Sequence, residues 1–355
     1  MRSTDIAGWF ADIGLADRPQ VGGKGGSLGE LQRAGIAVPP GFVVKTGAFE
    51  RFVQALEREA PVRAPIESLD ADDLDAVTKC CQQMRARVEA TELPADVLDE
   101  IAAAHAELCR TDIPGGGASV PVAVRSSATT EDAIDASFAG LQDTYLWVTS
   151  LEDTLKKVRS CWASLYSVES VTYRRKRGMP EDGVAMAVVV QKMVNARTAG
   201  VMFTRSPLTG DRSVITIEGA WGLGSAVVGG EVTPDRWVVG KITGEIPVRD
   251  ISDKQMQHLP LAAGGIEHVP VAEDQRRVAC MSDDELQALR AIGRKVEKHY
   301  GRAQDIEWAV ERDTNAILLL QSRPETVWSS KDAAPVARPV TDPLLHVMSI
   351  FGGQR

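Results

Sequence analysis

Residues 305–324 read DIEWAVERDTNAILLLQSRP, two largely apolar runs around a polar turn, and this pattern predicts a β-hairpin. Because side chains alternate across a strand, Glu307 should lie on the face opposite Trp308. Gln321 and Arg323 share a face of the second strand, so pairing would place them beside Glu307. A carboxylate, an amide and an arginine on one surface suit Mg²⁺ and polyphosphate. A surface salt bridge between Glu307 and Arg323 is the simpler alternative.

The sequence before this hairpin changes its pattern near residue 184. Further strands are predicted at 184–194, 200–204, 213–218 and 236–241. Upstream of residue 184, helical apolar stripes fill most of residues 46–112. We therefore predict an α+β protein with a helical insertion in its first half. The expected parts are 1–190, 191–327, and a linker with a tail at 328–355 that could dock a partner.

A glycine-rich segment near the N-terminus, VGGKGGS at 21–27, is a candidate for phosphate binding. Glycines let backbone N–H groups approach a phosphate, and a helix starting near Ser27 would add its N-terminal dipole. Lys24 would supply a full positive charge. The spacing does not match the P-loop, because Lys24 is followed by glycine rather than by serine or threonine. A merely flexible loop is the alternative interpretation.

A second candidate is VAVRSSA at 122–128, where a short strand ends in an arginine and two serines. Arg125 is suited to a bidentate contact with phosphate, because its guanidinium presents a planar fork of donors. Pairing of Arg125 with Glu131 or Asp132 is the structural alternative. The small residues of SFAGLQDT at 137–144 would let the backbone lie against a ligand.

Three weaker candidates come from the middle of the chain. Gln191 lies on a predicted strand, where its amide could read the edge of an adenine. The segments GVMFTRSP at 200–207 and IEGAWGLG at 217–224 combine polar groups with glycines. None of the three identifies a function when it is taken alone.

The composition excludes several classes of function. The 355 residues carry a net charge of −9, so broad binding to nucleic acid is not expected. The longest apolar stretch, at 184–190, is too short to span a membrane. The five cysteines form no Cys-x-x-Cys pair, and free thiols indicate a reducing compartment. We predict a cytoplasmic protein with neither nucleic acid nor membrane as a partner.

The order of the motifs is more specific than any one of them. The chain has GGK at 22–24, VRSS at 124–127, SFAG at 137–140, GVMFT at 200–204, GLG at 222–224, DIEW at 305–308 and LQSRPET at 320–326. This series resembles the ATP-binding domain of phosphoenolpyruvate synthase, pyruvate phosphate dikinase and rifampicin phosphotransferase. The resemblance implies a two-lobed ATP-grasp fold, with lobes at 1–190 and 191–327 and ATP and Mg²⁺ as cofactors.

The resemblance also assigns roles to single residues. It implies that Lys24, Arg125 and Arg323 contact the phosphates and act in catalysis. Gly140 and Thr144 would touch the nucleotide, and Gln191 would lie beside the adenine. Glu307 and Gln321 would hold ATP and Mg²⁺, and Glu218 is a weaker candidate on the metal side.

Two departures from the family pattern stand out. Related sequences often have Gly-Lys-Asn-Ala where this chain has Gly25 and Gly26, and Gly-Leu-Gly-Glu where it has Ser225. The family enzymes also continue into a domain with a Thr-Ser-His motif, and none of the histidines here lies in such a motif. The resemblance therefore implies a histidine-carrying phosphotransferase subunit as the partner.

Of the three functions considered, the first is the prediction and the other two are alternatives to it. A split arrangement resembles phenylphosphate synthase, whose ATP-binding subunit works with a separate histidine-carrying subunit and phenol as the final acceptor. In that scheme the β- and γ-phosphates of ATP pass to the histidine, leaving AMP and orthophosphate. A split phosphoenolpyruvate synthase or a rifampicin-type phosphotransferase is the second function. The third is a module that senses ATP without transferring phosphate.

Overall fold

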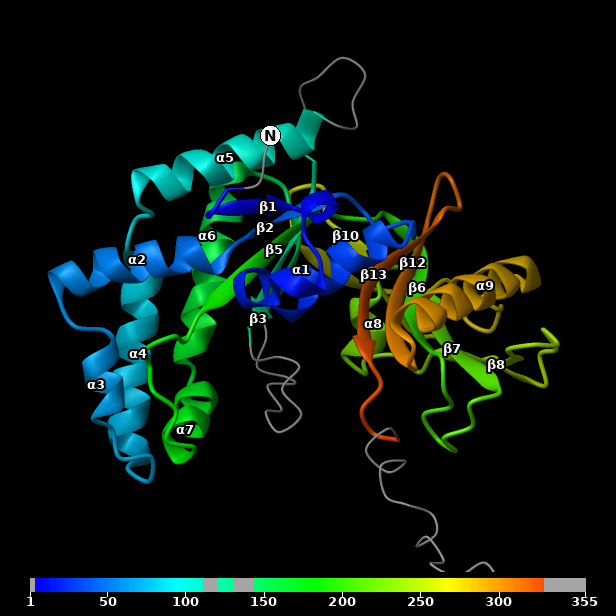
Figure 1. Cartoon of the computed structure of the whole chain (residues 1–355). Helices are drawn as coiled ribbons and strands as arrows, with labels where there is room; N and C mark the ends of the chain where they lie inside the picture. Colours follow the sequence, from blue (N-terminus) through cyan, green and yellow to red (C-terminus); the bar gives the residue numbers. More distant parts are fainter. Residues whose placement is uncertain (1–3, 111–119, 130–142, 329–355) are drawn as a thin grey trace, which may run out of the picture.

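The computed structural model describes residues 4–110, 120–129 and 143–328 (Figure 1). In these residues the strands form a five-stranded, a six-stranded and a two-stranded sheet. Every pairing between the named strands is antiparallel. Helices cover the two larger sheets. The chain is therefore a mixed α+β protein, as the sequence predicts.

The five-stranded sheet has the strand order β1-β2-β5-β3-β4. Its strands are β1 Ala7–Trp9, β2 Gly41–Val44, β3 Val122–Ala128, β4 Thr144–Val148 and β5 Met186–Lys192. β5 lies between β2 and β3 and reads MAVVVQK, and all but its last residue are buried. A run without polar alternation is expected where both faces of a strand are covered.

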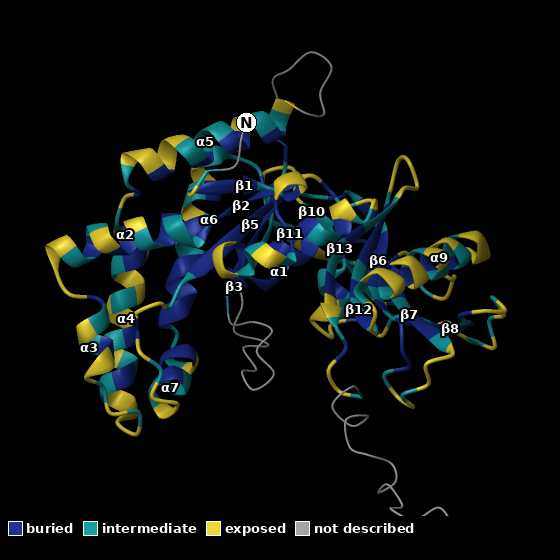
Figure 2. Cartoon of the chain, viewed as in Figure 1, coloured by how far each residue is buried: buried dark blue, intermediate teal, exposed yellow. Residues whose placement is uncertain are grey.

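Helices from the first half of the chain pack beside this sheet. They are α2 Thr46–Glu59, α3 Arg63–Glu67, α4 Leu74–Ala90, α5 Ala95–Arg110, α6 Leu151–Ala163 and α7 Val168–Lys176. Their inward faces are buried and their outward faces are exposed (Figure 2). Trp162 of α6 meets Phe49 and Phe52 of α2 with ring centroids 5.7 and 5.1 Å apart. Both helices carry apolar stripes on their inward faces, because these faces form the core. The stripe of α2 lies within 46–112, where the sequence predicts helices.

The six-stranded sheet has the order β13-β12-β6-β7-β8-β9. Its strands are β6 Ala196–Phe203, β7 Val214–Trp221, β8 Asp235–Gly240, β9 Val248–Asp250, β12 Gln304–Glu311 and β13 Ile317–Pro324. Ile306 and Trp308 of β12 lie in the core beneath α9, Asp283–Tyr300. The alternation predicted for β12 is therefore confirmed, and Glu307 lies on the opposite face of the sheet. Helix α9 begins with a capping box formed by Ser282 and Glu285.

Helix α1, Arg18–Arg33, contacts both β5 of the first sheet and β13 of the second. The expectation of a helix starting near Ser27 is wrong, because the glycine-rich segment is itself helical from Gly23 onward. Only Gly22 leaves the helix, at φ 70° and ψ 178°. A Cβ there would come within 2.2 Å of the Ser127 carbonyl oxygen. The positive φ and the close approach of the Ser127 carbonyl both require glycine at this position. Without a side chain at Gly22, the part of α1 that begins at Gly23 can pack against β3.

A buried ion pair anchors the segment that leads to a small hairpin, β10 Met256–Pro260 and β11 Ile266–Pro270. Lys254 Nζ lies 2.6 Å from Asp235 Oδ1, and both side chains are completely buried. Asp235 also accepts hydrogen bonds from the backbone N–H groups of Ser252 and Cys280, each at 2.9 Å. One carboxylate thus fixes β8 to the segments before and after the hairpin.

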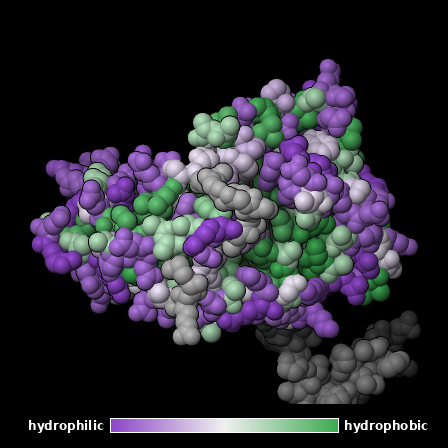
Figure 3. All heavy atoms as spheres, turned by 90° about the horizontal axis from the view of Figure 1, so that it is seen from above, coloured by the Kyte–Doolittle hydropathy of each residue, from purple (hydrophilic) through white to green (hydrophobic). Residues whose placement is uncertain are grey.

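Most of the surface seen from above is hydrophilic, with hydrophobic residues gathered near the middle of that face (Figure 3). Within residues 4–110, 120–129 and 143–328, no helix combines the length and the hydrophobicity that a membrane crossing requires.

Candidate functional site

A cavity of about 990 Å³ lies where α1 and the two larger sheets meet. Its lining includes seven of the residues predicted for the site: Lys24, Arg125, Thr144, Gln191, Glu307, Gln321 and Arg323. Gly140, the eighth, lies outside the described residues, as do Glu131 and Asp132. Residues from opposite ends of the sequence therefore share one cavity, which is large enough for a nucleotide.

Arg125 joins the two sheets at the centre of this cavity. It lies on β3 of the first sheet, and its Nη2 donates to Glu307 Oε2 at 3.0 Å and to Gln321 Oε1 at 2.6 Å. Its Nη1 donates to the Leu320 carbonyl at 3.0 Å. The arginine is only 8% exposed, and among the residues that the structure describes its buried Nε finds no hydrogen-bond partner. A buried donor without an acceptor is costly, which suits a site where an anionic ligand completes the pairing.

The β12–β13 hairpin arranges its polar side chains as the alternation predicts. Glu307 lies opposite Gln321, and Asp305 lies opposite Arg323. The alternative of a salt bridge between Glu307 and Arg323 is wrong, because Glu307 pairs with Arg125 while Arg323 Nε lies 3.4 Å from Asp305 Oδ2. The Arg323 side chain lines the cavity and is 61% exposed, so it is accessible from solution.

The pKa of Asp305 is raised above its usual range by burial, and the nearby Arg323 opposes that shift. An Arg323 that turned toward a phosphate would leave Asp305 without its cation. The pair therefore links the position of Arg323 to the protonation of Asp305.

Lys24 lies two residues after the backbone break at Gly22, in the first turn of the helix that starts at Gly23. Its side chain is buried and lines the cavity. The first backbone N–H groups of a helix are open to an anion, and the helix dipole adds to the charge of the lysine. Ser127 holds this helix start in place, because its Oγ donates to the Val21 carbonyl and accepts from Gly25 N.

Gln191 and Thr144 reach the cavity from the first sheet. Gln191 lies on β5 opposite Ala123, is almost fully buried, and donates from Nε2 to the Pro39 carbonyl at 3.2 Å. Thr144 begins β4 opposite Arg125 and is exposed. Their contacts with a nucleotide stay predictions, and the Gln191 amide would have its carbonyl oxygen left for that purpose.

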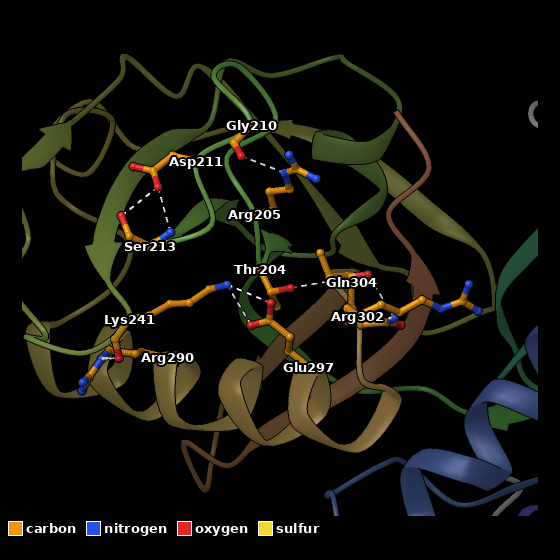
Figure 4. Close-up of polar contacts among 11 residues, drawn as sticks. Thr204, Arg205, Gly210, Asp211, Ser213, Lys241, Arg290, Glu297, Arg302 and Gln304 are labelled. Atoms are coloured by element: carbon orange, nitrogen blue, oxygen red, sulfur yellow. Dashed lines mark hydrogen bonds and ion pairs between the residues drawn. The ribbon is translucent and has the colours of Figure 1, made fainter. Parts of the chain in front are cut away.

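The motif at 200–207 serves mainly to position the hairpin (Figure 4). Thr204 N donates to the Gln304 carbonyl at 2.9 Å, and Gln304 N donates to Thr204 Oγ1 at 2.8 Å. Arg205 Nε donates to the Gly210 carbonyl at 2.7 Å. Only Gly200 of this segment lines the cavity. The bonds between Thr204 and Gln304 hold the start of β12, three residues before Glu307.

Glu218 lies on β7, on the same face of the sheet as Glu307 but two strands away, with Val201 between them. The described residues that line the cavity do not include Glu218. Burial raises the pKa of its carboxyl above the ordinary value, and Arg236 offsets part of this shift. Glu218 thus has no support from this geometry as a metal-side residue.

Replacing Glu218 with glutamine should change how stability depends on pH. A raised pKa means that the folded protein favours the neutral carboxyl, so wild-type stability is lost as pH rises through that pKa. Glutamine is neutral at every pH. The free energy of unfolding of Glu218→Gln minus that of the wild type should therefore grow between about pH 4 and pH 7, as measured by urea unfolding. A difference that stays constant or shrinks would contradict the burial argument.

Sequence reasoning missed one wall of the cavity. The hairpin β10–β11 contributes His258 and His268, and α8, Ser225–Val228, is followed by Glu231 on the same wall. No motif marks these residues, because they come together only when the hairpin folds back on α8. The sequence feature that could have drawn attention to this wall is Ser225, where the chain departs from the family pattern.

The residues present fit ATP with Mg²⁺. The cationic residues that line the cavity include the predicted Lys24, Arg125 and Arg323, and the lining also includes the half-buried carboxylate Glu307. Mg²⁺ in proteins takes one or two carboxylates together with phosphate oxygens, and the amide oxygen of Gln321 lies beside Glu307. The donor set suits a metal–polyphosphate better than an uncharged ligand.

A family model described as the pyruvate phosphate dikinase AMP/ATP-binding domain matches residues 18–342. The chain belongs to this family. Phosphoenolpyruvate synthase of Pyrococcus furiosus is 37% identical to this dikinase-family chain over an alignment of 372 positions, gaps included, which covers 94% of the chain and 45% of the relative. The probable phosphoenolpyruvate synthase of Methanocaldococcus jannaschii is 40% identical over 324 residues, 91% of the chain and 27% of that protein.

A rifampicin phosphotransferase from a Streptomyces species is 41% identical over 317 residues, which is 89% of the chain and 35% of the relative. The dikinase-family chain therefore spans between about a quarter and a half of the length of these relatives. The family match supports ATP as a ligand of this chain, as the sequence predicts.

Proposed function

We propose that this chain is the ATP-binding part of a dikinase-type phosphotransferase, which passes the β- and γ-phosphates of ATP to a histidine on a partner subunit or domain. Parts 1–190 and 191–327 would be the two lobes of an ATP-grasp fold, with the nucleotide between them. The observation that carries the proposal is Arg125, which reaches from the first sheet to Glu307 and Gln321 of the second inside one cavity.

In the proposed reaction, an imidazole nitrogen of the acceptor attacks the β-phosphorus of ATP. The bond between that phosphorus and the oxygen bridging to the α-phosphate breaks, and AMP leaves with the bridging oxygen. Hydrolysis then releases one orthophosphate and leaves a phosphohistidine. Mg²⁺, held by Glu307 and Gln321, would neutralise charge on the phosphate oxygens.

The chain's own cations do the remaining work. Lys24 and Arg125 would bind and orient the phosphates from the first sheet, and Arg323 would meet the transferring end from the second. Such catalysis consists mainly of positioning and charge stabilisation, because no side chain here needs to form a covalent bond. The exposure of Arg323 suits a contact near the side from which an acceptor histidine enters.

Among the final acceptors considered from the sequence, the relatives favour those of the phosphoenolpyruvate synthase and rifampicin types over phenol. Phosphoenolpyruvate synthases and a rifampicin phosphotransferase support an acceptor of one of those two types. The phenol acceptor of phenylphosphate synthase has no comparable support, so we propose the phosphoenolpyruvate synthase type as the first choice.

The test is to mix the chain with the histidine-bearing domain of a phosphoenolpyruvate synthase and with ATP labelled at either the β- or the γ-phosphate. Acid-labile label from the β-position should appear on the histidine domain, and AMP should be the nucleotide product. Parallel reactions with pyruvate, rifampicin or phenol would identify the final acceptor. Formation of ADP, or an equal rate of AMP formation by the chain alone, would contradict the proposal. Binding of MgATP to the chain alone, followed by tryptophan fluorescence, tests the site independently of the acceptor.

A further inference from the structure

A cluster of two histidines and a glutamate lies on the wall of the cavity that carries none of the predicted site residues. His258 on β10 and His268 on β11 are directly opposite each other in the hairpin. Their rings stack with centroids 4.0 Å apart and an interplanar angle of 19°. Glu231, from the segment after α8, approaches both rings. All three residues line the cavity.

The three ligand atoms converge on one point. His258 Nε2 and His268 Nδ1 each lie 3.3 Å from the same oxygen, Glu231 Oε2. All three potential ligand atoms lie within 4.8 Å of one another. Zinc–ligand bonds of about 2.0–2.2 Å in tetrahedral geometry place neighbouring ligand atoms roughly 3.4 Å apart. The separations from Glu231 Oε2 match that value, so only a small movement of the rings would be needed.

A second residue orients the buried histidine. Ser225 Oγ lies 2.8 Å from His258 Nδ1, and His258 is only 2% exposed. When Nδ1 carries the proton and donates to the serine, Nε2 is left with its lone pair facing Glu231. A hydrogen bond to the outer ring nitrogen is the usual partner of a metal-bound histidine.

We propose that Glu231, His258 and His268 form a binding site for a divalent transition-metal ion of the zinc type. Two imidazoles and one carboxylate suit zinc, cobalt or nickel, whereas Mg²⁺ prefers oxygen ligands. The site is therefore distinct from the Mg²⁺ position expected at Glu307 and Gln321. Glu231 and His268 are exposed, so an ion can enter from solution and its remaining positions are open to water.

The ion would join two segments that form one wall of the cavity. The backbone N–H of Leu223, just before α8, already donates to the His258 carbonyl at 2.9 Å. The tip of the hairpin reaches the first sheet, where Gly265 N donates to the Trp147 carbonyl at 2.9 Å. A metal ion bound by Glu231 and the two histidines would therefore stiffen the β10–β11 hairpin, which connects the second sheet to β4.

The competing explanation is an ion pair between Glu231 and protonated histidines, with no metal. Absorption spectra separate the two, because Co²⁺ held by histidine nitrogens absorbs visible light more strongly than hydrated Co²⁺. The full chain, free of any affinity tag and treated with a chelator, should bind one Co²⁺ with such a spectrum in the presence of excess Mg²⁺. Zn²⁺ should displace the Co²⁺ and raise the melting temperature.

Variants with a matched control complete the test. Ser225→Ala should weaken Zn²⁺ binding by about 10- to 100-fold. His268→Asn and Glu231→Gln should each weaken it more than Ser225→Ala does, because each removes a ligand atom itself. His299→Asn is the control, because His299 pairs with Glu30 on α1, and it should bind Zn²⁺ like the wild type. Equal Zn²⁺ affinity in the wild type and His268→Asn would overturn the proposal, as would the absence of one-to-one binding. MgATP binding reports on the proposed function separately.

Discussion

Replacing Arg125 with alanine is expected to slow AMP formation by about 10²–10³-fold. The same change should weaken MgATP binding by roughly 10- to 100-fold, the cost of losing a hydrogen bond to a charged group. Both effects arise because Arg125 is buried in the cavity and holds Glu307 and Gln321 in position. Arg125→Lys keeps the charge but loses the planar fork, so it should restore only part of the loss.

The control is Arg249→Ala, which removes an exposed arginine paired with Asp283, outside the residues that line the cavity. It should leave both ATP binding and turnover unchanged. Urea unfolding of each variant would show whether the folded state persists, since Arg125→Ala also leaves Glu307 without its cation. An Arg125→Ala protein that is folded and turns over ATP at the wild-type rate would rule out the proposed site.

Replacing Asp235 with alanine is expected to lower the free energy of unfolding by about 3–5 kcal/mol. The change leaves the Lys254 ammonium buried without its carboxylate, although the Ser252 carbonyl remains 3.1 Å away. It also removes the acceptor of the Ser252 and Cys280 backbone N–H groups. Because these segments flank the β10–β11 hairpin, its wall of the cavity should loosen as well.

The matched control is Asp250→Ala, which breaks an exposed ion pair with Arg236. An exposed pair of this kind contributes less than about 1 kcal/mol, so the control should remain close to the wild type. Replacing both partners, as in Asp235→Ala with Lys254→Met, should recover part of the loss because no buried charge remains. Equal destabilisation by Asp235→Ala and Asp250→Ala would contradict the role given to burial.

Local patterns in the sequence were sufficient to predict most of the elements. The β12–β13 hairpin was predicted from two apolar runs around a polar turn, and the helices within 46–112 were predicted from their apolar stripes. The start of α1 was not predicted from the sequence, because a run of glycines taken alone disfavours a helix. In the structure Gly25 and Gly29 pack closely against Val43 and Ile13, and side chains there would clash. Tertiary packing thus overrides the local propensity.

The sequence by itself determined which chemical groups the site would hold. Lys24, Arg125, Glu307, Gln321 and Arg323 stand in motifs whose residue types and order indicate an ATP-binding family. These signals can be recognised in the sequence alone, because each motif lies within a single turn, helix start or strand. Within such an element, the spacing of the residues sets the direction of their side chains.

Only the tertiary structure decided how those groups meet. It paired Arg125 with Glu307 and Gln321, and it placed Arg323 beside Asp305. It also brought Glu231, His258 and His268 to one point. Contacts between residues far apart in sequence depend on strand register and on how the sheets pack. The spacing of residues within one motif specifies neither of these.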